Sequence, residues 1–240
     1  MWMRLHLLGV NGPYPESLGA NSGYLLEADD VLLQFDFGAG VLARLTALTA
    51  PESLHAVFLS HWHFDHTSDL LPLIYRLQAA GRSLPVYAPV DESAALRKIV
   101  QAADCFTLTD IAPGDRIRVG NAEVQIGPAR HPIPAVGFRV EQGNRRFGYT
   151  GDTNTLPGLA AFYRGCQLLL ADGLFPEADW SENRPHLSAA LAAKLAVDAG
   201  AENLVLTHLN PVYAPSLLLR EARQVFPAAQ MAEIGRVIGI

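Results

Sequence analysis

One short stretch, residues 60–67 (SHWHFDHT), constrains this chain more than any other part of its sequence. It places three imidazoles and one carboxylate within six residues: His61, His63, Asp65 and His66. An apolar run, residues 56–59, comes directly before it, and a strand that ends in so many lone-pair donors is not burying them as core. Neutral imidazole and ionised carboxylate are ligands that Zn²⁺ and similar divalent cations accept. A solvated polar loop is the alternative, but ligand type and spacing together favour a metal site.

The composition is that of an ordinary folded protein. The chain has 240 residues, of which 50% are hydrophobic and 18% charged, enough for one large domain or two small ones. No apolar run approaches the roughly 20 residues that a membrane helix needs, and residues 1–9 are expected to form a first strand instead of a secretory signal. The isolated Cys105 and Cys166 predict neither a disulfide framework nor a zinc ribbon. We therefore expect a cytoplasmic protein without a membrane partner.

The charge balance bears on the choice of substrate. The net charge is −6, and Lys98 and Lys194 are the only lysines. Such a chain has no long-range attraction for nucleic acid, which usually needs a basic face. Bound metal ions would still add local positive charge, so small anionic substrates stay possible.

Strand and helix patterns alternate in both halves of the chain, with an antiparallel block between them. Strands are expected at residues 3–8, 24–28, 31–35, 56–59, 85–88, 116–119, 122–126, 135–141, 145–150, 168–171 and 204–206. Helices are expected at residues 41–48, 70–80, 91–102, 188–199 and 216–225. No Pro-, Gly- or Ser-rich linker divides the sequence, so it predicts a single α/β domain over residues 1–240, with two sheets covered by helices. The Gly-rich turn at residues 36–40 favours close backbone packing near the site over a phosphate cradle.

Three further ligand-type residues follow apolar strands: His131, Asp152 and His208. Carboxyl ends of strands are where an α/β sheet presents its ligands. Taken singly, each histidine would be expected to pack or to lie on the surface, but the shared position past a strand end favours a common site. Asp152 could bridge two cations with its two oxygens. Two other histidines lack this placement and are expected to be structural: His6 and His55.

The series His61-x-His63-x-Asp65-His66, followed by His131, Asp152 and His208, resembles the ligand series of the metallo-β-lactamase superfamily. The resemblance implies a four-layer αβ/βα sandwich, with two mixed sheets flanked by helices and a binuclear centre at one edge. It implies one metal on His61, His63 and His131, and a second on Asp65, His66 and His208. Asp152 would bridge the two divalent ions, which would be zinc or manganese.

The second half of the chain is similar to the ribonuclease Z and phosphodiesterase branch of that superfamily. The similarity lies in residues 149–153 (YTGDT), 172–175 (DGLF), 185–188 (PHLS) and 206–208 (LTH). That branch has an additional histidine before a helix, which His186 matches, and ribonuclease Z has Glu where Asp172 stands. Only 21 positions separate His131 from Asp152, which leaves no room for the long tRNA-clamping arm.

The resemblance implies a binuclear hydrolase that cleaves a small or cyclic phosphodiester, or a nucleic-acid fragment, through attack by a metal-bound hydroxide. Asp65 would orient the nucleophile or accept its proton. His186, oriented by Asp172, would stabilise the transition state or protonate the leaving oxygen. Trp62 and Phe64, with residues 174–184, either stack a base or simply pack the loop.

Other functions remain open on the same residues. An ester, thioester or lactone hydrolase would use the same metal site, and a ribonuclease Z-like RNA endonuclease is a further alternative. A binding protein with a degenerate site would lack bound metal, which the complete ligand set argues against. Diiron redox members typically have a Glu in the motif and a flavin module, and this sequence has neither. Dimers are common among the relatives, so a homodimer is compatible with the resemblance.

Overall fold

The computed structural model describes residues 2–240, which form two seven-stranded sheets. The first sheet has the spatial order β14-β1-β2-β3-β4-β5-β6. Its strands are β1 (Met3–Gly9), β2 (Gly23–Ala28), β3 (Val31–Phe35), β4 (Ala56–Phe58), β5 (Leu84–Pro89), β6 (Phe106–Ile111) and β14 (Val237–Gly239). β3 to β6 run parallel, whereas β14, β1, β2 and β3 pair antiparallel.

The second sheet has the order β13-β12-β11-β10-β9-β8-β7 and is also mixed. Its strands are β7 (Arg116–Val119), β8 (Ala122–Pro128), β9 (Val136–Gln142), β10 (Arg145–Tyr149), β11 (Leu168–Asp172), β12 (Asn203–Thr207) and β13 (Gln230–Met231). β10 to β13 run parallel, so their carboxyl ends meet at one edge.

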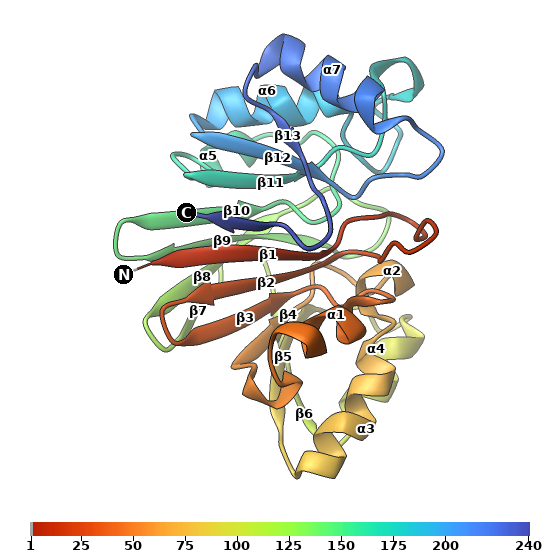
Figure 1. Ribbon diagram of the computed structural model, residues 1–240, viewed down its shortest axis with the longest axis vertical. Coiled ribbons are helices and arrows are strands. Elements are labelled where there is room, and N and C mark those ends of the chain that lie inside the picture. The colour runs from red at the N-terminus through yellow and green to blue at the C-terminus, as the bar shows by residue number, and fades with distance from the viewer. Residues whose placement is uncertain (1) are drawn as a thin grey trace.

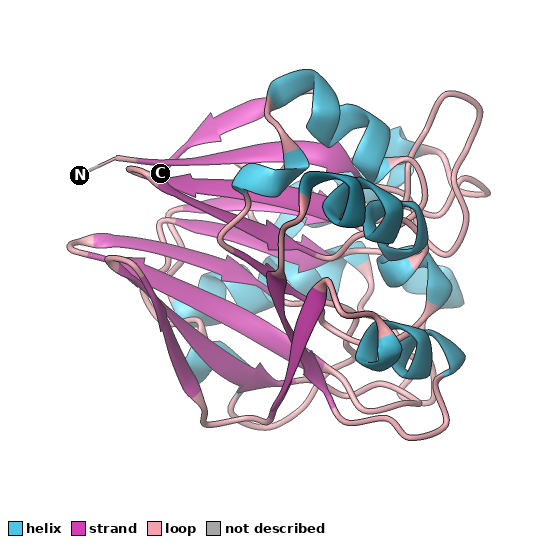
Figure 2. Cartoon of the chain, turned by 90° about the horizontal axis from the view of Figure 1, so that it is seen from below, coloured by secondary structure: helices cyan, strands magenta, loops and turns pink. Residues whose placement is uncertain are grey.

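Helices cover the outer face of each sheet, which gives four layers (Figures 1 and 2). On the first sheet these are α1 (Val41–Leu48), α3 (Leu70–Ala80) and α4 (Ala95–Ala102), with the short α2 (Phe64–Thr67) near the sheet edge. On the second they are α5 (Leu159–Phe162), α6 (Ala189–Ala199) and α7 (Pro215–Val225). The predicted αβ/βα sandwich is confirmed. No helix within residues 2–240 is long and apolar enough to cross a membrane.

The core between the sheets is aromatic. The Phe35 ring lies 5.5 Å from Phe58 in the same sheet, and 5.2 Å from Phe138 and 5.9 Å from Phe147 in the other, measured between centroids. All four side chains are fully buried, and each such burial contributes about 1.5–3 kcal/mol. This cluster fixes the two sheets face to face and so sets the spacing between their carboxyl-end edges.

Most predicted elements are present, and two expectations were wrong. The predicted helix over residues 91–102 begins at Ala95 instead, because Asp91 accepts hydrogen bonds from the Ser93 amide and hydroxyl and forms a turn. Residues 64–67, expected as loop, form α2. By contrast, α6 has the predicted ends: the Ser188 hydroxyl accepts from the Leu191 amide, and Gly200 is left-handed.

Candidate metal centre

Two clusters of ligand-type side chains meet at the carboxyl-end edge of the sheets. The first consists of His61, His63 and His131, and the second of Asp65, His66, Asp152 and His208. The candidate ligand atoms within each cluster lie within 4.8 Å of one another. The structure thus brings together all seven residues that the sequence singles out. They come from the ends of β4, β8, β10 and β12 and from α2.

The first cluster is a convergence of three imidazole nitrogens. Nδ1 of His63 lies 2.9 Å from Nε2 of His61 and 3.1 Å from Nε2 of His131. Burial lowers the pKa of His63, lowers the pKa of His61 well below its usual range, and lowers the pKa of His131 to about 4. These rings are therefore neutral at neutral pH, which is the form that donates a lone pair to a metal.

The second cluster surrounds the carboxylate of Asp152. Its Oδ2 lies 3.2 Å from Nε2 of His66, 3.3 Å from Nε2 of His208 and 3.6 Å from Nε2 of His61 in the first cluster. The same two nitrogens of His66 and His208, and Oδ1 of Asp152, are buried without a hydrogen-bond partner in residues 2–240. Burying such atoms unpaired costs free energy, and a divalent cation would satisfy them. The donor set therefore fits metal ions.

The second nitrogen of each buried ligand ring has its own partner. Ser60 Oγ lies 3.0 Å from Nδ1 of His61, and Ser22 Oγ lies 3.2 Å from Nδ1 of His208. Asp36 Oδ2 lies 2.8 Å from Nδ1 of His66. Such outer partners fix the orientation of a ligating imidazole and direct its other nitrogen at the metal.

Asp36 is a buried carboxylate with several hydrogen-bond donors around it, and the sequence interpretation missed its role. Besides His66, its carboxylate accepts hydrogen bonds from the Ser60 amide (2.7 Å), the Ser60 hydroxyl (2.8 Å) and the Tyr149 hydroxyl (2.6 Å). The available signal was its position one residue past β3, the same strand-end placement that singled out Asp152. The close packing expected for residues 36–40 is confirmed, since a Cβ on Gly38 would lie 2.1 Å from the Asp65 carbonyl oxygen.

His186 lies beside both clusters and is paired with Asp172. Its Nδ1 is 2.8 Å from Asp172 Oδ2 and 3.8 Å from Asp152 Oδ2, and its ring stacks on His208 at a centroid distance of 4.9 Å. Burial alone would lower the pKa of His186, but the carboxylates of Asp172 and Asp152 outweigh it and raise the pKa to about 9. In the metal-free protein the ring is therefore an imidazolium at neutral pH.

The two aromatic residues of the motif differ in their surroundings. Trp62 is buried and donates from Nε1 to the Pro89 carbonyl at 2.7 Å, so it packs the loop, whereas Phe64 is 65% exposed. Both line a hollow of about 280 Å³, but residues 174–184 do not. Of the two alternatives for these aromatics, packing of the loop describes Trp62, while Phe64 remains exposed beside a hollow that residues 174–184 do not line.

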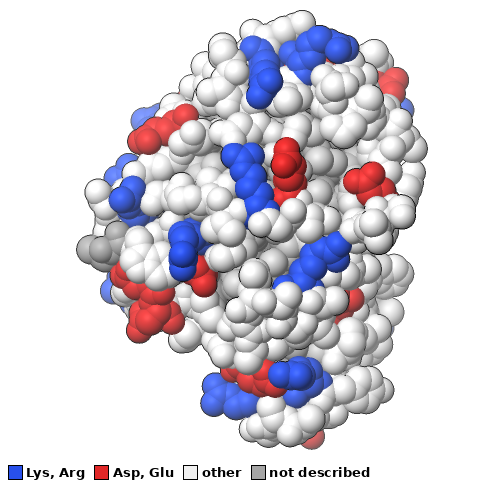
Figure 3. Space-filling model, in the orientation of Figure 1, with Lys and Arg blue, Asp and Glu red and all other residues white. Residues whose placement is uncertain are grey.

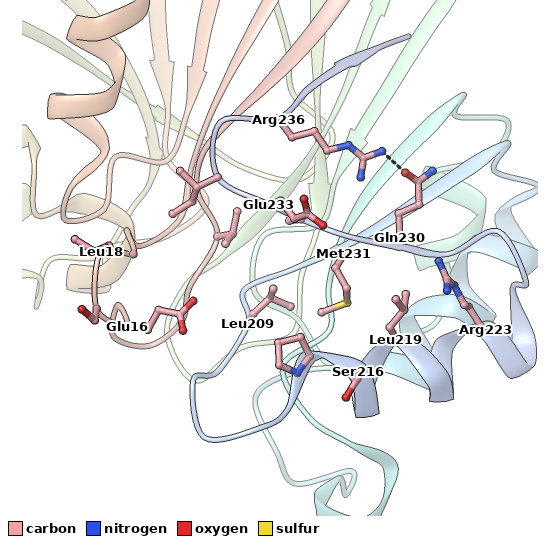
Figure 4. A pocket seen from close by; sticks show the side chains of 16 residues that line it. Glu16, Leu18, Leu209, Ser216, Leu219, Arg223, Gln230, Met231, Glu233 and Arg236 are labelled. Atoms are coloured by element: carbon pink, nitrogen blue, oxygen red, sulfur yellow. Dashed lines mark hydrogen bonds between the residues drawn. The ribbon is translucent and has the colours of Figure 1, made fainter.

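The remaining histidines lie outside the clusters, as expected. His6 is on β1, with Nε2 2.9 Å from Glu27, and His55 Nδ1 accepts from the Leu32 amide at 3.1 Å. A cavity of about 670 Å³ lies between residues 10–19, α7 and residues 230–236 (Figure 4). None of the seven candidate ligands lines it.

Comparison with known proteins agrees with this fold and site. Residues 34–209 match the family described as "Beta-lactamase superfamily domain". The chain belongs to this superfamily, as the resemblance in its sequence implied. Its relatives include a probable metallo-hydrolase and ribonuclease Z, and the chain is accordingly a metal-dependent hydrolase.

Three relatives illustrate the similarity. The probable metallo-hydrolase YhfI of Bacillus subtilis is 27% identical over 230 residues, which cover 93% of this chain and 94% of that protein. The YhfI crystal structure covers 100% of both chains with a TM-score of 0.94. Ribonuclease Z of Methanopyrus kandleri is 27% identical over 279 residues, 98% of this chain and 97% of that protein. The human short-form tRNase Z, at 20% identity and 98% coverage of both chains, shares the fold with a TM-score of 0.81.

Proposed function

We propose that this hydrolase cleaves a small or cyclic phosphodiester at a binuclear centre. The observation that carries the proposal is the pairing of His186 with Asp172 directly beside the carboxylate of Asp152. A protonated imidazole at that place can neutralise charge that develops on a phosphoryl or leaving oxygen. Ribonuclease Z relatives at 27% identity support the phosphodiester class.

The two clusters define the assignment of ligands. His61, His63 and His131 would hold one divalent cation, and Asp65, His66 and His208 the other, with Asp152 contacting both. Such ions, zinc or manganese, would supply positive charge that lowers the pKa of a water in the site and neutralises the phosphoryl oxygens.

Asp65 would act on the attacking water. Its Oδ2 lies 3.5 Å from Nε2 of His66 and 3.8 Å from Nε2 of His208. Burial would raise the pKa of Asp65, but the neighbouring His66 and His208 outweigh it and hold the pKa below its ordinary value. A carboxylate there can both serve as ligand and orient a water by accepting its hydrogen bond.

His186 would act on the leaving group. Asp172 takes the Nδ1–H of His186, which leaves Nε2 as the nitrogen available to substrate. Asp172 is itself fixed, because it accepts the amides of Thr153 and Leu174, both at 3.1 Å. The imidazolium can therefore donate its Nε2 proton to the leaving oxygen without a change of side-chain position.

Two features support a small substrate over a long polynucleotide. The segment between His131 and Asp152 contains only the hairpin of β9 (Val136–Gln142) and β10 (Arg145–Tyr149), with a two-residue connection. On the face shown in Figure 3, basic and acidic side chains are interspersed, and no continuous basic stripe crosses it. A long polynucleotide is held by many contacts to its phosphates, and neither the short hairpin nor the mixed charge of this face provides them.

We further propose that the described residues form one domain. The aromatic core joins the two sheets, and β14 near the C-terminus pairs with β1 near the N-terminus (Figure 1). Removing either end would therefore expose apolar surface of a shared core.

Hydrolysis of bis(p-nitrophenyl) phosphate by the zinc-loaded protein, compared with hydrolysis of a lactone, tests the function. We expect turnover of the phosphodiester, and a loss of about 10²- to 10⁴-fold in kcat for His186→Ala with zinc content unchanged. Unchanged phosphodiester turnover in His186→Ala would remove the assigned role. A protein active on the lactone alone would favour an ester or lactone hydrolase on the same site.

A further inference from the structure

A hollow of about 280 Å³ adjoins the metal centre and is not used by any of the roles above. Its lining comes from residues 62–64, residues 91 and 93–95, and Ile133. His63 belongs both to this lining and to the first histidine cluster. A group bound in the hollow would therefore contact a residue that also faces the reacting atoms.

Phe64 offers an exposed aromatic ring to this hollow. The ring is 65% exposed, although its sequence neighbours on both sides, His63 and Asp65, are candidate ligands held by α2. A single exposed apolar side chain is common and does not by itself mark a site. Here, however, the backbone of α2 fixes the ring at the rim of a hollow, where it can cover a flat ligand.

Asp91 supplies the second, independent observation. It is 8% exposed, and its Oδ1 accepts both the Ser93 amide (3.0 Å) and the Ser93 hydroxyl (2.5 Å). Its other carboxylate oxygen has no hydrogen-bond partner, and no Lys or Arg pairs with it, in the part of the chain that the structure describes. This oxygen is not among the buried unpaired atoms, so it is open to solvent and can accept an N–H or O–H from a ligand in the hollow.

Four other lining residues are apolar: Trp62, Ala94, Ala95 and Ile133. The buried Trp62 is fixed by its hydrogen bond to Pro89, and Ile133 is half-buried on another wall. The volume lies just below the roughly 300–1,000 Å³ of pockets that enclose whole drug-sized ligands. The hollow therefore suits one ring system of a larger substrate.

We propose that this hollow is a subsite for a flat heteroaromatic ring with an amino group, which stacks on Phe64 and donates an N–H to Asp91. The inference rests on the proposed function, because the ring would belong to a phosphodiester whose phosphate lies at the metal centre. Bases with exocyclic amino groups, such as cytosine, have this chemistry. Stacking on an aromatic side chain is tolerant of base identity, so Asp91 supplies the discrimination.

Calorimetric titration of the zinc-loaded protein with CMP and with UMP tests the subsite. These nucleotides differ along one ring edge: cytosine has an exocyclic amino donor beside the acceptor N3, whereas uracil has a carbonyl acceptor beside an N3–H donor. We expect CMP to bind about 5- to 100-fold more tightly. Asp91→Asn keeps an oxygen for Ser93 and turns an amide N–H₂ toward the hollow, so it should reverse the preference in favour of UMP.

Phe64→Leu tests the stacking role. Leucine preserves an apolar helix former in α2, so zinc content should be unchanged, while both nucleotides should bind about 5- to 100-fold more weakly. Tyr75→Leu is the matched control, because Tyr75 is 76% exposed on α3 and does not line the hollow. If Phe64→Leu lost zinc, its nucleotide affinity would no longer report on stacking. The preference of Asp91→Asn between CMP and UMP would then test the subsite by itself.

The outcomes separate this inference from the proposed function. Equal affinity for CMP and UMP, absence of nucleotide binding, or an unchanged preference in Asp91→Asn would each overturn the subsite. Failure of the phosphodiesterase proposal would appear independently, as absent hydrolysis of bis(p-nitrophenyl) phosphate by the zinc-loaded protein.

Discussion

Oδ2 of Asp172 lies 2.8 Å from Nδ1 of His186, which joins the end of β11 to the loop before α6. The side chain of Asp172 is shorter than the Glu that the sequence resemblance implies at this position, yet it reaches the imidazole. It does so because Phe175 and Ser188 form a β-bridge that draws the two segments together. The Ala189 amide also donates a hydrogen bond to the Phe175 carbonyl at 2.9 Å, and this contact keeps the same two segments close together.

Asp172 and His186 should therefore behave as one unit in catalysis. We expect His186→Gln to lower kcat by about 10²- to 10⁴-fold. Asp172→Asn should lower kcat by at least about tenfold, because an amide cannot hold the imidazolium or its Nδ1–H tautomer as a carboxylate does. The double variant should be little worse than His186→Gln alone, and steady-state kinetics on bis(p-nitrophenyl) phosphate measures this. Fully additive losses would argue that the two side chains act separately.

The raised pKa of His186 predicts a pH-dependent stability in the metal-free protein. The pKa is about 9 in the folded chain, above its ordinary value of 6.5. The folded state therefore binds the proton more tightly, and this contribution is fully present below about pH 6.5 and is lost as pH rises through about 9. Urea unfolding between these pH values should show a decline that is smaller in His186→Gln, because neighbouring carboxylates also raise the pKa of His66 well above its ordinary value and leave its contribution in place. An equal decline in the variant would assign it to other groups.

Asp36 should control metal affinity without being a ligand. Asp36→Asn keeps the size of the side chain but removes the charge that holds Nδ1 of His66, so we expect zinc affinity to fall by about 10- to 100-fold. Competition with a chromophoric chelator measures the change. Tyr149→Phe, which removes one of several donors to the same carboxylate, should weaken zinc binding less. A loss in Tyr149→Phe as large as that in Asp36→Asn would point to general destabilisation.

The convergence of the candidate ligands could be predicted from the sequence because it follows a simple geometric rule. Strands β8, β10 and β12 alternate with β9 and β11 in one sheet and end at the same edge, so His131, Asp152 and His208 converge with the motif that follows β4. Asp36 obeys the same rule at the end of β3, but one carboxylate before a Gly-rich turn is weak evidence in a sequence. Its importance comes from tertiary contacts to Ser60 and Tyr149, which lie 24 and 113 positions away.

Other features depend on packing that no local pattern encodes. The strands β13 (Gln230–Met231) and β14 (Val237–Gly239) have two and three residues, too few for a periodic signal. The start of α4 was misjudged because the Asp91–Ser93 turn competes with the first helical turn. The hollow beside Phe64 was missed because residues 91–95 reach the motif only in three dimensions.

Asp152 should be required for both ions. Asp152→Asn removes the charge from a carboxylate that lies within 3.6 Å of nitrogens from both clusters. We expect bound zinc to fall from about two ions per chain toward one or none, with loss of phosphodiester hydrolysis. Metal analysis after dialysis against a weak chelator measures the stoichiometry. A variant that keeps its full zinc content would contradict the bridging role.

Gly12 should be required for the position of His208. A Cβ at Gly12 would lie 2.1 Å from Cε1 of the His208 ring, and the Gly12 amide donates to the Leu209 carbonyl at 3.1 Å, so neither backbone can easily move away. Gly12→Ala should therefore displace His208 and lower the zinc content by about one ion per chain, while the first cluster keeps its metal. Gly239→Ala is the control, since a Cβ there would meet nothing within 4 Å. Metal analysis together with thermal unfolding measures both variants, and normal zinc content in Gly12→Ala would show that the ring is not confined at this contact.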